Sequence, residues 1–313
     1  MDLYSNYCVH SQYFVNHLSF ISCLLIITMS LYKTKILGIG VTTDSKKNIL
    51  EEVQKYLKKQ AADSLQRSAK EQKSFIIVTP NPEQVVLAQK DTRFREIINR
   101  ADVAIPDGIG LVAAMRLLAQ SSVISRQSSD LKRISGVELM DDLVKLAVKE
   151  GYRIGLIGGR GGVAVKALEC LSRRWPGLRG WAMEPEGKTM KEISKMIAER
   201  DTRIVFVGLG APKQEYFIER LVLSLRDPAS WRGAANLITR EIASSKTPRN
   251  DNVVFMSVGG AFDEISGRVP RPPKFIDAIG LKWLWRLLIE PWRFSRQLRL
   301  LKFVWLVLLE MTR

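Results

Sequence analysis

The chain has 313 residues, enough for one large α/β domain or two smaller ones. Its 48 Lys and Arg against 32 Asp and Glu give a formal net charge of +16, which favours an anionic partner: a phospholipid surface, a phosphorylated substrate or nucleic acid. Both histidines and two of the three cysteines lie within the first 23 residues, which excludes a histidine-based triad, a histidine-ligated zinc and a disulfide framework from the rest of the chain.

Residues 1–28 differ from the remainder in composition. No Lys or Arg precedes Lys33, and the apolar run Leu18–Ile27 is short. A secretory signal needs basic residues before its apolar stretch, and a membrane-spanning helix needs about 20 apolar residues. We therefore interpret residues 1–28 as an extension upstream of a true start at Met29, with a weak membrane anchor as the alternative.

From Lys33 onward, short apolar strands alternate with helices. Strands are predicted over 35–41, 74–79, 101–105, 153–157, 203–207 and 253–258, a loop over 120–135, and helices after most strands, the clearest over 83–90 and 136–150. This alternation predicts an α/β fold with a Rossmann-like, mostly parallel sheet and helices on both faces. We assign residues 29–267 to this domain and interpret 224–252 as a polar insertion within it.

Residues 268–313 form a separate C-terminal segment. They carry ten basic and three acidic residues, a net charge of +7, together with four tryptophans interleaved with Leu and Phe. An amphipathic segment rich in Arg and Trp is typical of one that lies along a membrane surface. The sequence therefore predicts a basic, membrane-associating helical appendage, with an ordinary solvated helix as the alternative.

Three predicted strands end in turns that carry reactive groups. Residues 79–82 offer the Thr79 hydroxyl and the Asn81 amide, and Asp107 places a carboxylate between Pro106 and Gly108. Residues 210–215 open a helix whose first amides favour anions. Ligands of open parallel sheets bind at the carboxyl ends of strands, so these turns predict a site. Asn81 and Asp107 are also common helix N-caps, which is the alternative for each.

A glycine-rich turn at 158–162 follows another predicted strand. It lacks the G-x-G-x-x-G pattern of dinucleotide sites and the Lys-Ser/Thr of a P-loop, so it is a weak nucleotide signal. Together with the turn at 210–215 it offers three glycines and a lysine as candidates for substrate binding, namely Gly158, Gly159, Gly210 and Lys213. No D-x-D motif occurs, so we predict no metal site and no cofactor.

Five segments, in this order and spacing, resemble the WecG/TagA/CpsF family, glycosyltransferase family 26. They are Thr-Pro-Asn-Pro at 79–82, Ala-Asp-Val-Ala-Ile-Pro-Asp-Gly-Ile-Gly at 101–110, Arg-Ile-Ser-Gly-Val-Glu-Leu-Met at 133–140, Val-Gly-Leu-Gly-Ala-Pro-Lys-Gln-Glu at 207–215 and Val-Gly-Gly-Ala-Phe-Asp at 258–263. Residues 271–274, 280–286 and 290–293 also look like the family's C-terminal appendage. The resemblance runs from about Lys35 to the C-terminus.

The resemblance implies an inverting, metal-independent transfer of N-acetylmannosamine, or its uronic acid, from a UDP-sugar. The acceptor would be the GlcNAc of GlcNAc-diphospho-undecaprenol, in cell-surface polysaccharide or teichoic acid synthesis. By motif, Asp107 would be the catalytic base, and Thr79, Asn81 and Gln214 would line the sugar site. Arg133 would lie near the acceptor or donor phosphate. The appendage would complete the site with Arg286 and Arg293 and, with them, Arg296.

The residue types suit this chemistry. Without histidine the base must be Asp, Glu, Lys or Tyr, and without a metal motif arginines supply the positive charge for a leaving diphosphate. The low cysteine content fits a reducing cytoplasm. We predict a cytoplasmic enzyme, peripheral on the inner face of the cell membrane, whose partners are a UDP-sugar donor, an undecaprenyl-diphosphate-linked acceptor and the anionic membrane surface, without nucleic acid.

Two alternatives remain at this stage. A Rossmann-type nucleotide-dependent oxidoreductase would need a tighter glycine fingerprint and an acidic ribose ligand about 20 residues later. A non-enzymatic membrane- or nucleic-acid-binding module would account for the charge, but it would leave the motifs at the strand ends without a role.

Overall fold

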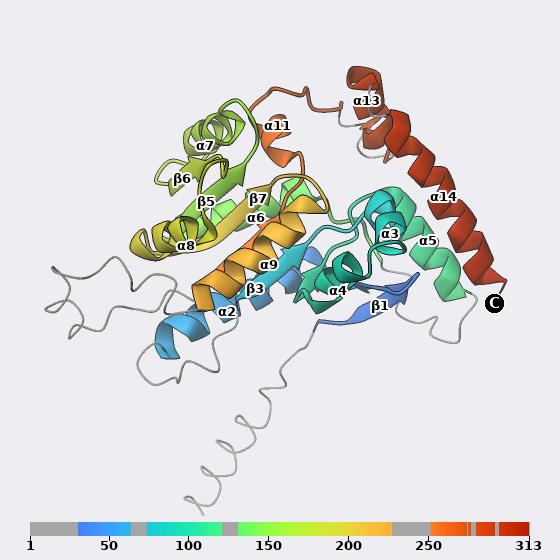
Figure 1. Cartoon of the computed structure of the whole chain (residues 1–313), viewed down its shortest axis with the longest axis horizontal. Helices are drawn as coiled ribbons and strands as arrows, with labels where there is room; N and C mark the ends of the chain where they lie inside the picture. Colours follow the sequence, from blue (N-terminus) through green and yellow to red (C-terminus); the bar gives the residue numbers. More distant parts are fainter. Residues whose placement is uncertain are drawn as a thin grey trace, which may run out of the picture. The chain divides into compact units, whose positions relative to one another are not determined.

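The computed structural model describes residues 31–63, 74–120, 131–226, 252–273, 275–276, 280–291 and 294–312. Its centre is a six-stranded sheet in the order β4-β3-β8-β7-β5-β6, in which every neighbouring pair runs parallel (Figure 1). The strands are β3 (Phe75–Val78), β4 (Val103–Ala104), β5 (Arg153–Gly158), β6 (Arg179–Met183), β7 (Thr202–Gly208) and β8 (Val254–Ser257). The predicted α/β fold with a parallel sheet is therefore confirmed.

Helices cover both faces of this sheet. On one face, α8 (Met190–Glu199) and α9 (Lys213–Arg226) share a buried cluster with Val205, Val207 and Phe255 of the strands. Side chains alternate along a strand, so the residues between these point to the opposite face. There α6 (Gly136–Glu150) and α7 (Val163–Arg174) contact β5.

The predicted single strand over 35–41 is wrong. The chain forms a hairpin of β1 (Lys33–Ile36) and β2 (Ile39–Thr42), which pair antiparallel in a sheet of their own. Leu37 and Gly38 have φ angles of 48° and 77°, the left-handed conformation that a tight hairpin turn requires. The Thr42 hydroxyl accepts a hydrogen bond of 3.0 Å from the Ala104 amide, so the hairpin is tied to the edge strand β4.

Three elements were absent from the sequence prediction: α4 (Thr92–Arg100), β6 and α8. Asp91 caps α4, and α8 begins with a capping box in which Thr189 and Glu192 satisfy each other's backbone amides. Thr-x-x-Glu is a readable helix-start signal, so α8 was detectable. The edge strand β6 was harder to detect, because its first two residues are exposed.

Two predicted connections are only partly described. After α5 (Ile109–Gln120), residues 121–130 of the predicted loop lie outside the described residues, and 131–135 have no regular structure. Helix α9 continues to Arg226, so the predicted insertion begins later than residue 224, and 227–251 also lie outside the described part. The same holds for residues 1–28, so their interpretation stays a prediction. A helix α2 (Lys46–Asp63) follows the hairpin and contacts α6.

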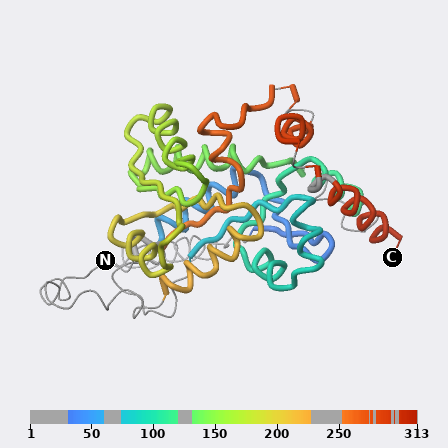
Figure 2. Tube along the Cα trace, turned by 45° about the horizontal axis from the view of Figure 1, so that its top comes forward, coloured from blue at the N-terminus to red at the C-terminus, as the bar shows by residue number. Residues whose placement is uncertain are grey.

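The predicted helical appendage is present as α13 (Lys282–Ile289) and α14 (Phe294–Met311). Phe303 and Val307 of α14 are buried in a cluster with residues of α5 and of α3 (Pro82–Ala88). Figures 1 and 2 both show this C-terminal helix beside α5, at the end of the sheet away from α8. The tail therefore lies against the half of the molecule that contains β3 and β4.

Candidate active site

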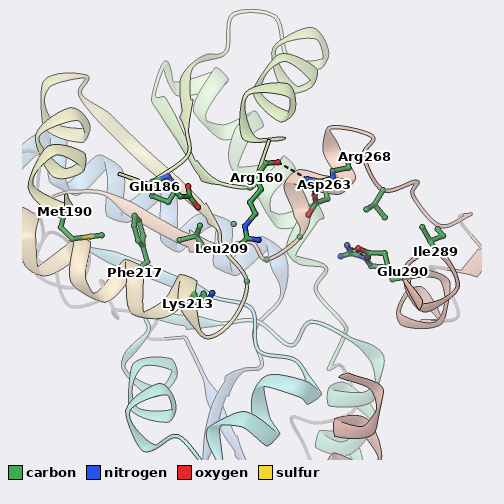
Figure 3. Close-up of a pocket in the computed structure, with 18 residues that line it drawn as sticks. Arg160, Glu186, Met190, Leu209, Lys213, Phe217, Asp263, Arg268, Ile289 and Glu290 are labelled. Atoms are coloured by element: carbon green, nitrogen blue, oxygen red, sulfur yellow. Dashed lines mark hydrogen bonds and ion pairs between the residues drawn. The ribbon is translucent and has the colours of Figure 1, made fainter. Parts of the chain in front are cut away.

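All six strands end at the same edge of the sheet, and a larger and a smaller cavity open there. The larger cavity has a volume of about 810 Å³ (Figure 3). Its lining comes from the turns after β5, β6, β7 and β8, from α9 and from α13: Gly159, Arg160, Pro185, Glu186, Met190, Gly208, Leu209, Gly210, Lys213, Phe217, Gly259, Gly260, Asp263, Arg268, Val269, Arg286, Ile289 and Glu290.

The smaller cavity has a volume of about 260 Å³ and lies at the ends of β3 and β4. Its lining is Asn81, Pro82, Glu83, Asp107, Gly108, Ile109, Gly110, Arg133, Gly280, Lys282, Trp283, Arg286 and Leu300. Arg286 of α13 borders both cavities, so they are neighbours with one guanidinium at their junction.

Glycine allows two close approaches at this edge of the sheet, one behind the larger cavity and one in its wall. Gly158 has a φ of 122°, and a Cβ there would lie 2.5 Å from the carbonyl oxygen of Gly208, so the ends of β5 and β7 meet backbone to backbone. A Cβ on Gly260 would lie 2.7 Å from Nη1 of Arg286. The guanidinium thus occupies the space that a side chain at position 260 would take.

Arg286 is held by its own helix. Its Nη2 lies 2.9 Å from a carboxylate oxygen of Glu290 one turn later, and both side chains are less than one-fifth exposed. Three further cations line the same cavity, from the turn after β5, from the start of α9 and from the segment after α11 (Ala261–Ile265): Arg160, Lys213 and Arg268. Such a set suits an anionic group with several oxygens.

The larger cavity has two chemically different ends. Figure 3 shows Met190 and Phe217 together at one end, and Arg268 with Glu290 at the other. Arg160 lies between the two ends, and its carbonyl oxygen accepts a hydrogen bond of 3.1 Å from Arg268. The cavity thus joins an apolar recess to a region of fixed charge.

Asp107 follows β4 and its side chain lines the smaller cavity. Its backbone amide donates a hydrogen bond of 3.0 Å to Pro80, which fixes the turn after β4 against the turn after β3. Burial raises the pKa of the Asp107 carboxyl above its ordinary value, although the charges of Lys282 and Arg133 pull that pKa down. A carboxylate with a raised pKa beside a cavity has the properties of a general base.

Thr79 and Asn81 flank the same turn but lie differently. Asn81 caps α3, because its side-chain oxygen accepts a hydrogen bond of 3.0 Å from the Gln84 amide, and it also lines the smaller cavity. The capping alternative for Asn81 is thus confirmed without displacing it from the site. Thr79 is buried, and its hydroxyl donates to the Ser257 carbonyl over 3.4 Å, so it joins the ends of β3 and β8.

Gln214 is fully buried and lines neither of the two cavities. Its amide nitrogen donates to Glu215 over 2.8 Å, and its side-chain oxygen accepts from the Gly259 amide over 3.0 Å. In this arrangement the side chain supports the turn after β8. Burial raises the pKa of Glu215 to about 7, although the Gln214 amide opposes the shift.

The structure brings most of the candidate residues together. Gly159, Gly210, Lys213 and Arg286 meet at the larger cavity, and Asn81, Asp107, Arg133 and Arg286 at the smaller one. Thr79, Gly158 and Gln214 line neither of these two cavities. Arg293 lies outside the described residues, as does the side chain of Arg296 in α14. The catalytic and binding roles of all these residues stay predictions.

Other residues of the site were missed from the sequence. They are Arg160, Glu186, Asp263 and Arg268 at the larger cavity and Lys282 at the smaller one. Asp263 ends one of the segments that carry the family resemblance, and Arg160 lies within the glycine turn. Both residues therefore belong to segments that the sequence already singles out as part of a site. Lys282 lies within residues 280–286, which resemble the family's appendage, but so does Arg286, and the sequence does not separate their roles.

Two features are absent from the part of the chain that the structure describes. No group of three or more His, Cys, Asp or Glu side chains in that part is arranged to hold a metal ion. Within the same ranges, no helix combines the length and the apolar character that crossing a membrane requires.

The comparison with known protein families gives a match over most of the sequence. The model of the family described as "Glycosyl transferase WecG/TagA/CpsF family" matches residues 48–237 and 240–313. These ranges include every strand of the parallel sheet, both cavities and the helical tail. The chain belongs to the WecG/TagA/CpsF family of glycosyltransferases, which act in the synthesis of cell-surface polymers.

Proposed function

We propose that this glycosyltransferase moves N-acetylmannosamine, or its uronic acid, from a UDP-sugar to the GlcNAc of GlcNAc-diphospho-undecaprenol. The observation that carries the proposal is the pair of neighbouring cavities that share Arg286, one with a candidate base and the other with several cations. A transferase for two substrates needs two adjoining sites whose reacting atoms meet. Because the chain belongs to a family of glycosyltransferases, the oxidoreductase and the non-enzymatic alternatives are set aside.

The larger cavity suits the nucleotide donor. Its apolar end, with Met190 and Phe217, offers a recess for a base and ribose (Figure 3). Arg160, which lies between the two ends, and Arg286, which also lines the cavity, offer their guanidinium groups to a diphosphate. This orientation directs the anomeric carbon toward Arg286 and the smaller cavity. The volume of about 810 Å³ is within the range of small-molecule sites in proteins.

The smaller cavity suits the acceptor hydroxyl and the base. Asp107 takes the proton from that hydroxyl as its oxygen forms a bond to the anomeric carbon of the donor. The bond from that carbon to the diphosphate breaks on the opposite side, which inverts the configuration. UDP leaves with the bonding electrons, and guanidinium groups neutralise the developing charge in place of a metal ion.

The tail suits a lipid-linked acceptor. Several large apolar side chains of α13 and α14 are exposed, among them Leu288 at 72% and Leu301 at 69%. The exposed basic residues Arg299 and Lys302 lie beside them in α14. Apolar and basic side chains on one exposed helix favour docking at the headgroup level of an anionic membrane. We therefore propose that the enzyme acts at the inner face of the cell membrane.

A transfer assay tests the proposal with the full chain and a short-chain synthetic GlcNAc-diphospholipid. UDP-N-acetylmannosamine and its uronic acid should support UDP release, and UDP-GlcNAc and UDP-glucose should not. The product should have the anomeric configuration opposite to that of the donor, which NMR coupling constants report. Turnover should be unchanged in EDTA. Activity that disappears in EDTA and returns with Mg²⁺ would contradict the metal-independent mechanism.

A pair of variants distinguishes a loss of catalysis from a loss of the folded state. Asp107→Asn should reduce turnover by about 10²- to 10⁴-fold, because the amide is no longer a base. Asp141→Asn is the matched control and should remain active, since Asp141 is a half-buried residue of α6 that pairs with Arg174 and lines neither cavity. Near-normal turnover in a folded Asp107→Asn variant would remove Asp107 from the role of base.

A further inference from the structure

Lys282 connects the tail to the proposed base through charge. It is the first residue of α13, and its ammonium nitrogen lies 2.7 Å from a carboxylate oxygen of Glu264 in α11. Glu264 is 11% exposed and Lys282 is 24% exposed, so solvent screens this ion pair only partly. Lys282 also lines the smaller cavity together with Asp107. One lysine of the tail is thereby fixed beside two carboxyl groups from different elements.

The charged groups around Asp107 come from four elements. Lys282 of α13 and Arg133 before α6 favour the ionised carboxylate, whereas Glu264 of α11 disfavours it. Arg286 of α13 and Glu83 of α3 complete the charged lining of the cavity. Burial of Asp107 raises its pKa, and Lys282 provides the largest opposing charge effect. The largest compensating charge effect on the buried carboxylate therefore comes from a residue of the tail.

We infer that Lys282 is a positioning residue whose charge, held in place by Glu264, keeps Asp107 ionised and so able to act as a base. This inference rests on the proposed function of Asp107. Because Lys282 begins α13, its charge acts on Asp107 only when α13 lies over the ends of β3 and β4. The tail then does more than supply arginines to the diphosphate, since it also sets the protonation state on the acceptor side.

The two cations of α13 act at different cavities. Lys282 is paired with Glu264 and acts on Asp107, whereas Arg286, one turn later, is paired with Glu290 and lies against Gly260 at the larger cavity. The two residues share a helix, a sign of charge and a place in the lining of the smaller cavity. Arg286 is thus a matched control for Lys282.

The deciding experiment measures the titration of Asp107 in the full chain labelled with ¹³C at the aspartate carboxyls. The Asp107 signal is the one missing from Asp107→Asn. In Lys282→Met its midpoint should move to higher pH, whereas in Lys282→Arg it should stay close to that of the parent chain. Arg286→Met should move the midpoint less than Lys282→Met does. An unchanged midpoint in a folded Lys282→Met variant would overturn the inference.

The pH profile of transfer gives a second measurement. Lys282→Met should lower turnover more at pH 6 than at pH 9, because Asp107 loses its proton again as the pH rises. Arg286→Met should lower turnover to a similar extent at both pH values. An equal loss at both pH values in Lys282→Met would assign Lys282 a merely structural role and contradict the inference.

The two measurements also separate this inference from the proposed function. If the midpoint of Asp107 moves as expected but no UDP-sugar is consumed, the electrostatic coupling stands and the proposed reaction fails. If transfer proceeds and the midpoint does not move, the proposed reaction stands and the inference fails. Lys195→Met, at an exposed lysine paired with Glu199 on α8, should change neither measurement.

Discussion

The central strands and the C-terminal tail use apolar residues in opposite ways. Every residue of β8 is buried, as is every residue of β5 except Arg153. By contrast, α13 has no buried residue, and among the described side chains of α14 only Phe303 and Val307 are buried. The strands therefore hold one another in place. The tail packs on α3 and α5 but buries few of its own side chains and keeps apolar surface exposed.

This difference identifies the part of the site that is attached through the fewest buried side chains. The turns at the strand ends are fixed by the sheet, whereas Lys282 and Arg286 belong to the tail. Burial of one large apolar side chain contributes about 1.5–3 kcal/mol, so Phe303 and Val307 give α14 only modest attachment. The completeness of the site thus depends on a segment that buries fewer of its side chains than the strands do.

Removal of the tail after Gly267 should have the largest effect. Transfer should be abolished even with a soluble short-chain acceptor, because Lys282 and Arg286 are lost together. The sheet should still unfold cooperatively, since all of its strands precede residue 258. UDP release and thermal unfolding followed by circular dichroism measure the two properties. A truncated protein that transfers at the rate of the full chain would show that the tail serves only as an anchor.

Two phenylalanine deletions compare the attachment of strand and tail directly. Phe255→Ala, in the fully buried β8, should reduce the free energy of unfolding by about 3–5 kcal/mol. Phe303→Ala should reduce it by less than about 2 kcal/mol, because α14 can separate while the sheet stays folded. Denaturant titration gives both values, and hydrogen exchange should accelerate in α14 of Phe303→Ala. Equal losses in the two variants would mean that tail and sheet unfold as one unit.

Glu215 tests how firmly the turns at the strand ends are buried. Burial raises its pKa to about 7, and the unfolded value is about 4.3, so the folded protein binds an extra proton between these values. Stability is therefore lost as the pH rises through this window, by on the order of 2–4 kcal/mol in total. Glu215→Gln should remove that loss.

The measurement for Glu215 is denaturant unfolding at pH 4.5, 6 and 8. The difference between the parent chain and Glu215→Gln should grow with pH, in favour of the variant. Glu199→Gln, an exposed control on α8, should follow the parent chain at every pH. A parent chain whose stability relative to Glu215→Gln stays constant would place the Glu215 carboxyl in contact with solvent.

Substitution on the exposed face of the tail should have the smallest effect on folding. Leu301→Ala should change the free energy of unfolding by no more than about 0.5 kcal/mol, because the side chain is 69% exposed. The same variant should bind anionic vesicles more weakly in a sedimentation assay, since it removes apolar area from the proposed membrane face. Unchanged vesicle binding in Leu301→Ala and in Trp305→Ala would exclude this face of α14 as the docking surface.

The sequence by itself determined the fold class, the helical tail and the turns that carry Asn81, Asp107 and Lys213. These features are local: an apolar run of five or six residues followed by Gly, Pro or Asp predicts a buried strand and the turn at its end. Parallel strands then bring such turns to a common edge without further information. The features that the sequence prediction missed are local as well. The hairpin turn at Leu37–Gly38 and the capping box at Thr189 are each signalled by only a few residues.

Only the tertiary structure decided which of these residues face a cavity. Gln214 and Lys213 are neighbours in sequence, yet Gln214 is buried beneath the turn after β8 and Lys213 lines the larger cavity. The same holds for Asp107, Glu264 and Lys282, which are more than 150 residues apart at the extremes but whose charges act on one another across the smaller cavity. Burial and charge interactions of this kind depend on distances through space, and no spacing along the chain encodes them.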